Sequence, residues 1–304
     1  MSADDEADYQ REQCIVAQRE YAASMPADAM AQSWSHATTE AATAVKLTLS
    51  QTHLLANIED ALRQGGRHTS VLRQMLAPPL SQDQFEIFCE LYRKPTENSN
   101  RPVSDDAAKQ IVQVFRERID PCLAPWVSQE RAPEDYEIDR VVHAIGPLLA
   151  SQIYLTGRRT STSQVQEDAV VDLLEAKGWN RLPGRSLIDR NAVLDAKQFI
   201  KKAKFATTTR PQEIDIACGL GATKVLAMEC KVSNDRTNSI KRVNDVLKKA
   251  TAWRDHWGSF VRPAALLQGM IGYKDVQRLT HAGVSVFWSH DLPRFDQWLD
   301  KNVS

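Results

Sequence analysis

Two apolar segments joined by a glycine-containing turn constrain the fold most strongly. Residues 213–218 (EIDIAC) alternate polar and apolar side chains, and residues 224–232 (KVLAMECKV) form a nearly continuous apolar run. A period of two predicts a strand with one buried face, and a short apolar run is typical of a buried strand. Gly219 and Gly221 supply turn residues between the segments. We therefore expect a β-hairpin that lies within a sheet.

Helical and strand patterns alternate around this hairpin. Apolar residues at three- and four-residue spacing predict helices over 163–177, 237–257, 274–281 and 294–301, and shorter apolar runs predict strands over 264–271 and 284–288. A further strand is expected between residues 187 and 205. The order α-β-β-β-α-β-α-β-α predicts the α/β class, with a mixed central sheet flanked by helices.

Residues 1–134 show helical periodicity only. Helices are expected over 9–25, 38–62, 82–92 and 104–119, separated by glycine and proline residues. We therefore expect an all-helical N-terminal domain over 1–134 and a second domain, which contains the hairpin, over 135–304. A helix over 141–154 begins this second domain, and Gly157, Arg158 and Arg159 form a basic turn after it. The helical domain carries no chemical motif, so we expect an accessory, dimerisation or DNA-contacting role.

Charge is divided unevenly along the chain. The formal net charge is −1, but residues 1–150 sum to −9 and residues 151–304 to +8. A basic half attached to an acidic half is expected if only the second half faces a polyanion such as DNA. The alternative is a charge-complementary interface between the two halves.

Other features of the composition exclude several classes of protein. No apolar run approaches the roughly 18 residues of a membrane-spanning helix, so we expect no membrane partner. The acidic amino terminus lacks an apolar signal segment, which predicts a cytoplasmic location. The five cysteines include no C-x-x-C pair, which argues against a zinc site and a disulfide framework.

Three charged residues of the hairpin are expected to converge. Glu229 and Lys231 are two residues apart on one strand and share a face, which Asp215 approaches from the neighbouring strand. Two adjacent carboxylates repel unless a cation lies between them, and their oxygens suit Mg²⁺, with Mn²⁺ as a substitute. The Cys230 side chain is expected in the core, so that only its backbone carbonyl is available as a third metal ligand.

This arrangement suits hydrolysis of a phosphodiester. Mg²⁺ held by two carboxylates leaves room for a phosphate and an attacking water, and Lys231 can hold that water or help to deprotonate it. Asp followed by Glu-x-Lys at this spacing also occurs by chance in many proteins, and the alternative is a surface salt bridge on an edge strand. The position at the end of a buried strand, before a basic amphipathic helix, favours catalysis.

At these residues the chain resembles the PD-(D/E)xK nuclease superfamily, in particular the XamI-like type II restriction endonucleases. The resemblance depends on Glu167 in TSTSQVQEDAVVDLLEAKGW, Asp215 in EIDIAC, the Glu229–Lys231 triplet in MECKVSND, and the continuation RTNSIKRVNDVLKKATAW. It implies a restriction-endonuclease-like core, Mg²⁺ bound by Asp215 and Glu229, Lys231 at the attacking water, and Glu167 as an auxiliary acid. No proline precedes the aspartate, so Glu213 remains a rival to Asp215.

Residues beside the triplet are expected to contact DNA. Polar and basic side chains that can bind base edges or phosphates lie after the second strand of the hairpin and in the expected turn: Ser233, Asn234, Arg236, Asn238, Ser239, Lys241, Arg242, Arg158 and Arg159. The alternative is that the serine and asparagine residues only build a loop and cap a helix. A basic run over residues 197–204 either follows a DNA backbone or is simply solvated.

The leading hypothesis is a Mg²⁺-dependent, sequence-specific endonuclease that cuts both DNA strands by attack of water and leaves 5′-phosphates. Reading a palindrome with one active site per subunit favours a homodimer. The resemblance further implies a cognate DNA methyltransferase as the functional partner in a restriction-modification system. The alternatives are a repair or junction-resolving nuclease of the same fold, or a DNA-binding module whose acidic pair is only structural.

Overall fold

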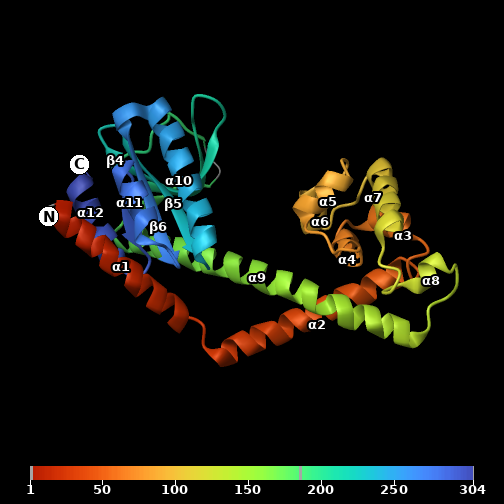
Figure 1. Ribbon diagram of the computed structural model, residues 1–304. Coiled ribbons are helices and arrows are strands. Elements are labelled where there is room, and N and C mark those ends of the chain that lie inside the picture. Colours follow the sequence, from red (N-terminus) through yellow and green to blue (C-terminus); the bar gives the residue numbers. More distant parts are fainter. Residues whose placement is uncertain (1–2, 185–186, 304) are drawn as a thin grey trace. The chain divides into compact units, whose positions relative to one another are not determined.

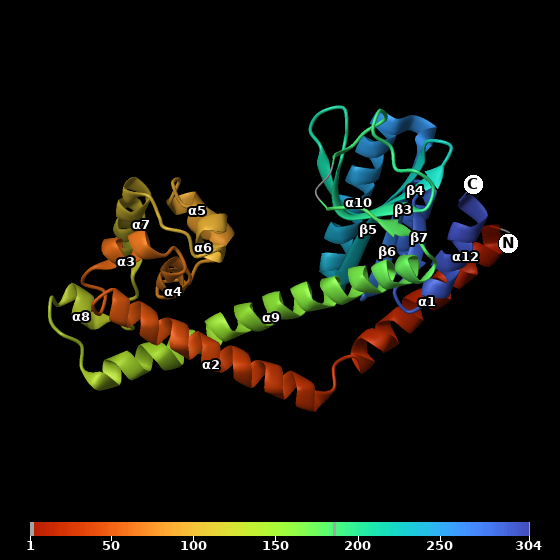
Figure 2. The same ribbon diagram turned by 180° about the vertical axis from the view of Figure 1, so that it is seen from behind.

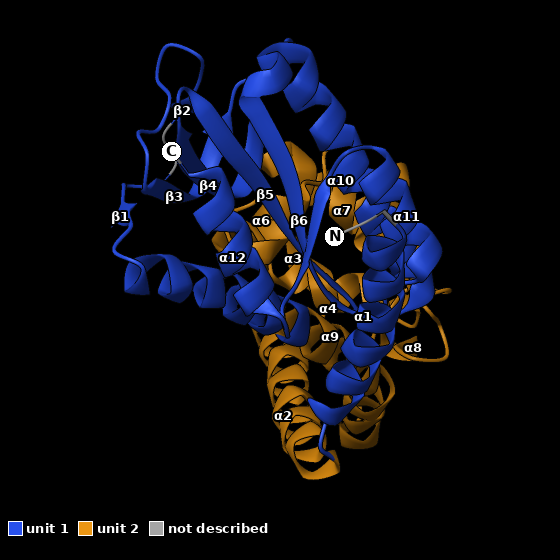
Figure 3. Cartoon of the chain, turned by 90° about the vertical axis from the view of Figure 1, so that its left-hand side faces the viewer, with its two compact units in different colours: residues 1–26, 158–304 blue, residues 27–157 orange. Residues whose placement is uncertain are grey.

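The structure is a computed structural model that describes residues 3–184 and 187–303. Its contacts divide the chain into two compact units, which Figure 3 shows in two colours. Unit 1 comprises residues 1–26 and 158–304, and unit 2 comprises residues 27–157. Within the described ranges no helix is long and apolar enough to cross a membrane.

A seven-stranded mixed sheet forms the centre of unit 1 (Figures 1 and 2). The strand order is β1-β3-β4-β5-β6-β7, with β2 also paired to β3. The pairs β3–β4 and β4–β5 are antiparallel, whereas β5–β6 and β6–β7 are parallel. The strands are β1 (Asn180–Arg181), β2 (Leu187–Ile188), β3 (Gln198–Phe205), β4 (Gln212–Gly221), β5 (Lys224–Ser233), β6 (Val261–Gly269) and β7 (Ser285–Trp288).

Helices cover both faces of this sheet because both faces are apolar. Residues of α1, α10 and α11 share buried clusters with one face, for example Val246 of α10 with Ala265 of β6. The other face packs against α9 and α12, for example Val170 of α9 with Met228 of β5. The helices are α1 (Ala3–Ala23), the later part of α9 (Asp135–Ala176), α10 (Arg236–Trp257), α11 (Tyr273–His281) and α12 (Leu292–Asn302), with the 3₁₀ turn η1 (Gly258–Phe260) after α10.

The predicted fold class is confirmed. The hairpin forms as β4 and β5, the strand expected between residues 187 and 205 is β3, and the remaining elements follow in the predicted order. The alternation of EIDIAC is visible in the burial of β4, where Ile214 and Ile216 are buried while Glu213 is exposed and Asp215 is partly buried. Period-two patterning therefore located the sheet correctly.

The expected basic turn at Gly157, Arg158 and Arg159 is wrong. One helix, α9, runs without interruption from Asp135 to Ala176 and contains all three residues. A glycine inside a helix lowers the stability of that helix by about 1 kcal/mol relative to alanine, and the hydrogen-bonded turns on either side of Gly157 offset this loss. Pro147 is accommodated within the same helix.

The regular elements of unit 2 that the structure describes are helices, joined by loops and one isolated β-bridge between Leu76 and Ile119. Its helices are α2 (Ala27–Gln51), α3 (Ile58–Gln64), α4 (His68–Gln74), α5 (Gln82–Phe88), α6 (Lys94–Asn98), α7 (Asp105–Arg118), α8 (Pro125–Ser128) and the first part of α9. The single helix expected over 38–62 is therefore wrong. Left-handed backbone at His53, Leu54 and Leu55, with φ of 48°, 58° and 74°, separates α2 from α3, and such angles cannot continue a right-handed helix.

A buried ion pair ties α4 to α6 inside unit 2. Arg73 and Glu97 are both almost fully buried, and Arg73 Nη2 lies 3.1 Å from Glu97 Oε1. The Tyr92 hydroxyl donates to Glu97 Oε2 at 2.6 Å, and Gln82 Nε2 donates to Oε1 at 2.8 Å. Additional hydrogen bonds of this kind offset the cost of burying a charge pair.

The first helix belongs to unit 1, although we expected the domain boundary between residues 134 and 135. The Tyr9 hydroxyl donates to Asp291 Oδ2 at 2.6 Å, and Trp288 Nε1 donates to Gln10 Oε1 at 2.8 Å. Cys14 and Ala17 pack in the cluster that covers β6 and β7. These contacts join residues 282 and 278 positions apart, and such long-range contacts leave no signal in the local sequence pattern. The expected domain boundary therefore differs from the division into units that the contacts give.

We expect Gly219→Ala to lower the free energy of unfolding by about 1–3 kcal/mol. A Cβ atom at Gly219 would lie 1.9 Å from the backbone oxygen of Asp195 and 2.7 Å from that of Leu194, so the backbone must shift. The measurement is thermal unfolding followed by circular dichroism. The matched control is Gly157→Ala, an exposed helical position with no atom within 4 Å of the added methyl group. This control should gain about 0.5–1 kcal/mol, and equal effects of the two changes would contradict the close approach.

Candidate active site

The two strands of the hairpin separate at the charged residues. Pairing of β4 with β5 ends at Ile216 opposite Met228, but β5 remains paired to β6 as far as Ser233 opposite Gly269. Beyond the last pair, Asp215 Oδ2 accepts a hydrogen bond from the backbone N–H of Cys230 at 2.8 Å. The Asp215 carboxylate thus accepts from a backbone N–H that the pairing of β4 with β5 leaves free. We call this point the fork.

Nine charged side chains meet around the fork, and we call them the ion cluster. Its five carboxylates belong to Glu167, Asp168, Asp215, Glu229 and Asp245, and its four ammonium groups belong to Lys201, Lys202, Lys231 and Lys249. They come from α9, β3, β4, β5 and α10. The structure therefore brings together all four residues predicted for catalysis, and the cluster keeps one negative charge in excess.

Glu229 is the most deeply buried member of the ion cluster, with 0% of its surface exposed. Its Oε2 accepts from Lys231 Nζ at 2.6 Å and from Lys249 Nζ at 2.9 Å. Burial raises the pKa of this carboxyl above its usual value, the nearby Asp215 adds to that increase, and the two lysines oppose it. Its position inside the protein thus depends on these two cations.

Lys231 joins the strand to helix α10. Its ammonium contacts Glu229, two residues before it, and also lies 2.9 Å from Asp245 Oδ2. Burial alone would lower the pKa of Lys231, but the carboxylates of Glu229, Asp215 and Asp245 together outweigh burial and raise this pKa above its usual value. The side chain is therefore a positively charged hydrogen-bond donor at neutral pH. As expected, Glu229 and Lys231 share a face, while Cys230 between them packs in the apolar cluster on the opposite side.

Sequence reasoning missed the roles of Lys201, Lys202 and Lys249. Lys202 Nζ donates to Glu167 Oε1 and to Asp215 Oδ1, both at 2.5 Å. Lys201 Nζ donates to Asp168 at 2.6 Å. The basic run over residues 197–204 thus places two of its lysines on carboxylates. Lys249 Nζ donates to the backbone oxygen of Glu213 at 3.0 Å as well as to Glu229, so it bridges the separated strands.

The rival carboxylate, Glu213, is exposed, and its backbone oxygen rather than its side chain contacts the ion cluster. Asp215 is the β4 carboxylate that contacts Lys202 and the Cys230 amide. The contacts therefore favour Asp215 over Glu213. The signal for Lys249 was present in the sequence, because it lies on the basic face of the predicted helix over 237–257.

Two buried carboxylate oxygens keep acceptor capacity that a cation could use. In the part of the chain that the structure describes, Glu229 Oε1 and Glu167 Oε2 have no hydrogen-bond partner. Glu167 Oε2 has only the Lys201 ammonium nearby, at 3.6 Å. Within residues 3–184 and 187–303, no group of three or more His, Cys, Asp or Glu side chains is arranged to hold a metal. The two predicted ligands therefore differ, because Glu229 has one such oxygen, whereas both oxygens of Asp215 already accept a hydrogen bond, from Lys202 and from the Cys230 N–H. Mg²⁺ commonly keeps several waters beside so few protein ligands.

The segment after β5 contains most of the residues expected to contact DNA, but only some of them are accessible. Ser233 and Ser239 are buried, and their hydroxyls donate to the Asp235 carbonyl at 2.7 Å and to Asp275 Oδ2 at 2.9 Å. Asp235 caps α10 by accepting from the backbone N–H of Asn238 at 2.7 Å. Both serines therefore fit the alternative in which these residues build the loop and cap the helix rather than contact DNA. The exposed or partly exposed residues of the segment are Asn234, Arg236, Asn238, Lys241 and Arg242.

Helix α1 supports this segment through Tyr21. The Tyr21 hydroxyl donates to Asn234 Oδ1 at 2.9 Å, and the guanidinium of Arg158 lies 5.0 Å from the centre of the same ring. Two residues predicted to contact DNA, Arg158 and Asn234, are therefore held beside each other by a residue from the first helix. Arg159, next on α9, is exposed. Tyr21 carries no motif that could have identified it.

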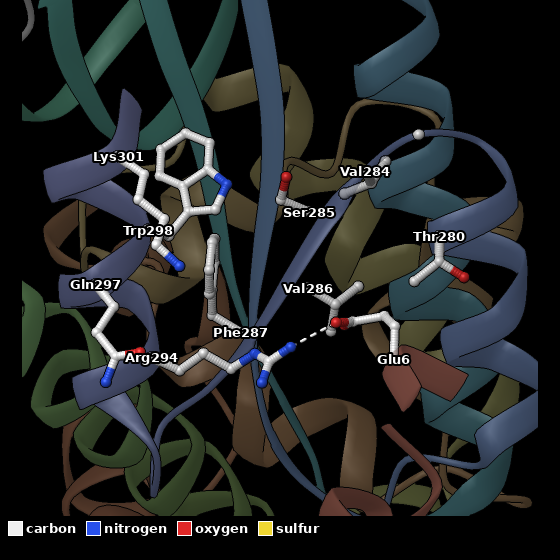
Figure 4. Close-up of a pocket in the computed structure, with 11 residues that line it drawn as sticks. Glu6, Thr280, Val284, Ser285, Val286, Phe287, Arg294, Gln297, Trp298 and Lys301 are labelled. Carbon is white, nitrogen blue, oxygen red and sulfur yellow. Dashed lines mark hydrogen bonds and ion pairs between the residues drawn. The ribbon is translucent and has the colours of Figure 1, made fainter. Parts of the chain in front are cut away.

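A cavity of about 520 Å³ lies away from the ion cluster, beside the edge strand β7 (Figure 4). Ser285 and Phe287 of β7, Arg294 and Trp298 of α12, and Glu6 of α1 are among its lining residues, and Figure 4 shows the contact between Arg294 and Glu6. No member of the ion cluster lines it. The candidate active site is thus the fork, not this cavity.

Comparison with known proteins identifies the family. The model of the XamI restriction endonuclease family matches residues 53–288. The type II restriction enzyme XamI of Xanthomonas campestris pv. amaranthicola is 28% identical over 189 residues, which cover 62% of this chain and 67% of that enzyme. The crystal structure of protein VC1899 from Vibrio cholerae aligns with 89% of this chain at 12% identity, but the TM-score is 0.31 and the chain spans 56% of that protein. The match to the family model covers most of the chain and confirms the resemblance, so the chain belongs to the XamI family of type II restriction endonucleases.

Proposed function

We propose that the chain cuts double-stranded DNA at a specific sequence by Mg²⁺-dependent attack of water, at a PD-(D/E)xK site formed by Asp215, Glu229 and Lys231. The enzyme class, a type II site-specific deoxyribonuclease, follows from the family. The observation that carries the proposed site is the fork, where two carboxylates and a lysine from separated strands meet beside unpartnered buried oxygens. Mg²⁺ is the proposed cofactor, with Mn²⁺ as a substitute.

Each residue has a separate role in this proposal. Asp215 and Glu229 would hold the metal, with the backbone carbonyl of Cys230 as a further ligand. Bound there, Mg²⁺ would lower the pKa of a water molecule and polarise the phosphate. The protonated Lys231 holds the attacking water by hydrogen bonding and offsets the negative charge that develops on the phosphate. Glu167 is an auxiliary acid beside Asp215, to which Lys202 links it in the free protein, and the products carry 5′-phosphates.

DNA binding is proposed for the accessible residues around the fork. Asn234, Arg236, Asn238, Lys241 and Arg242 extend from the end of β5 into the first turns of α10. Lysine and arginine contacts to phosphates fix the register of a protein on DNA, whereas amide side chains can read base edges. Arg158 and Arg159 of α9 add positive charge. We further propose a homodimer that reads a palindrome, with a cognate DNA methyltransferase as its functional partner.

We expect Asp215→Ala and Lys231→Ala to retain DNA binding and to lose cleavage by at least about a hundredfold, because each removes a group that acts on the reacting phosphate. Cleavage is measured on plasmid DNA under single-turnover conditions, and binding is measured by gel shift with Ca²⁺ in place of Mg²⁺. The matched control is Lys224→Ala, an exposed lysine at the far end of the hairpin. Wild-type cutting rates in either site variant would contradict the proposed site.

The smaller role of Glu167 is tested by Glu167→Ala, for which we expect a loss of about ten- to a hundredfold in cleavage, typical of residues that orient metal ligands. The control is Asp172→Ala, an exposed carboxylate five residues later on the same helix. The same single-turnover assay compares the two variants. An unchanged rate in Glu167→Ala would remove this residue from the site.

Metal dependence is the third expectation. Plasmid DNA incubated with the protein should remain intact in EDTA and give discrete bands once Mg²⁺ or Mn²⁺ is restored, because the proposed attack uses a water that a metal ion activates. Discrete bands indicate a site-specific enzyme, whereas a smear indicates a repair nuclease. Cleavage that continues in EDTA would refute the metal requirement.

A further inference from the structure

Lys202 bridges two carboxylates, and one of them, Asp215, is a proposed metal ligand. Its ammonium contacts Glu167 Oε1 and Asp215 Oδ1 at 2.5 Å each, so these carboxylates from α9 and β4 share one positive charge. Glu167 is almost fully buried and the Asp215 side chain is largely buried, whereas the Lys202 side chain is 50% exposed. A half-exposed cation on two buried anions can leave toward solvent without opening the core.

The backbone at Lys202 is in an unusual conformation. Its φ is +60°, the left-handed region, in the middle of a strand. A residue other than glycine held there is strained, and this conformation persists only where the surroundings impose it. Lys202 falls opposite Asp215 in the β3–β4 register, between the pairs Lys201–Ile216 and Ala203–Ile214. The distortion thus directs the ammonium at that carboxylate, and such outliers cluster at functional sites.

We propose that Lys202 is a positioning residue that competes with the metal: its ammonium occupies the Asp215 carboxylate, and bridges it to Glu167, in the free protein and leaves Asp215 when metal and DNA arrive. This inference rests on the proposed function, because it takes Asp215 as a metal ligand. In the free protein Lys202 keeps two anions together that would otherwise repel. The displaced ammonium then lies beside a bound phosphate, where its charge remains compensated.

Competition between Lys202 and the metal predicts the opposite change in metal affinity from a purely structural role of Lys202. A metal that binds the free protein must displace the Lys202 ammonium, and its apparent affinity is reduced by the cost of that displacement. Removing the ammonium should therefore tighten metal binding. If Lys202 only held the carboxylates in place, its removal would let them move apart and metal binding would weaken.

The test is titration of the full-length protein with Mn²⁺ alone, without DNA, followed by the electron paramagnetic resonance signal of free Mn²⁺. We expect Lys202→Met to bind Mn²⁺ about tenfold more tightly than the wild type, a change within the usual range of coupling between sites. Lys202→Gly also removes the ammonium and suits a backbone with φ of +60°, so it should fold readily and show the same gain. Lys224→Met controls for the loss of one lysine from an exposed position.

Each result has a definite meaning. Tighter binding in both Lys202 variants, with Lys224→Met unchanged and Asp215→Ala weakened, supports the competition. Equal or weaker binding in the Lys202 variants, while the wild type binds Mn²⁺ and Asp215→Ala does not, overturns the inference and leaves the proposed function intact. Absence of Mn²⁺ binding in the wild type and all variants overturns the inference together with the proposed metal site.

Discussion

A carboxylate without any exposed surface, that of Glu229, is the constraint on which the rest of the site depends. A buried charge must be paired, and removing one partner of such a pair typically costs about 3–5 kcal/mol. Its two partners come from different elements, Lys231 from β5 and Lys249 from α10. The register of the helix on the strand is therefore coupled to the charge balance, because a shift of either element would leave an anion unpaired inside the protein.

The separation of β4 from β5 at the fork determines which groups surround the Glu229 carboxylate. Had β4 and β5 stayed paired beyond Ile216 and Met228, the Cys230 N–H would have been available to a backbone oxygen. Instead the Asp215 carboxylate accepts from it, and Lys249 bridges from Glu213 to Glu229. The continued pairing of β5 with β6 keeps one arm of the fork fixed. Rigid support for reacting groups on strands is more exact than support on loops.

Local sequence patterns predicted most elements of unit 1, apart from the short strands β1 and β2 and the continuous helix α9. They also selected Asp215, Glu229 and Lys231, which the structure brings together at the fork. Period-two alternation identified β4 and β5, and because side chains two apart share a face, it also predicted that Glu229 and Lys231 lie together. The family resemblance supplied Glu167, which the structure places beside Asp215 through Lys202.

What local patterns could not supply are contacts made across long stretches of chain and backbone that departs from ideal geometry. Lys202 reaches the site through a left-handed residue inside a strand, which periodicity does not encode. Tyr21 reaches Asn234 across more than 200 residues. Gly157 predicts a helix end, but α9 continues through this exposed position because the hydrogen-bonded turns on either side offset the low helix propensity of glycine.

The position of α1 has a topological consequence. Because α1 packs with β6, β7 and α11, the chain leaves unit 1 after residue 26 and returns to it at residue 158. Unit 2 is thus an insertion within a discontinuous domain, and both ends of the chain belong to the same unit, where Glu6 contacts Arg294. Domain insertion of this kind is tolerated where the connecting segments lie at the surface of the host. The core of unit 1 is therefore complete only after the chain has returned from unit 2, since α1 precedes the insertion and the strands of the sheet follow it.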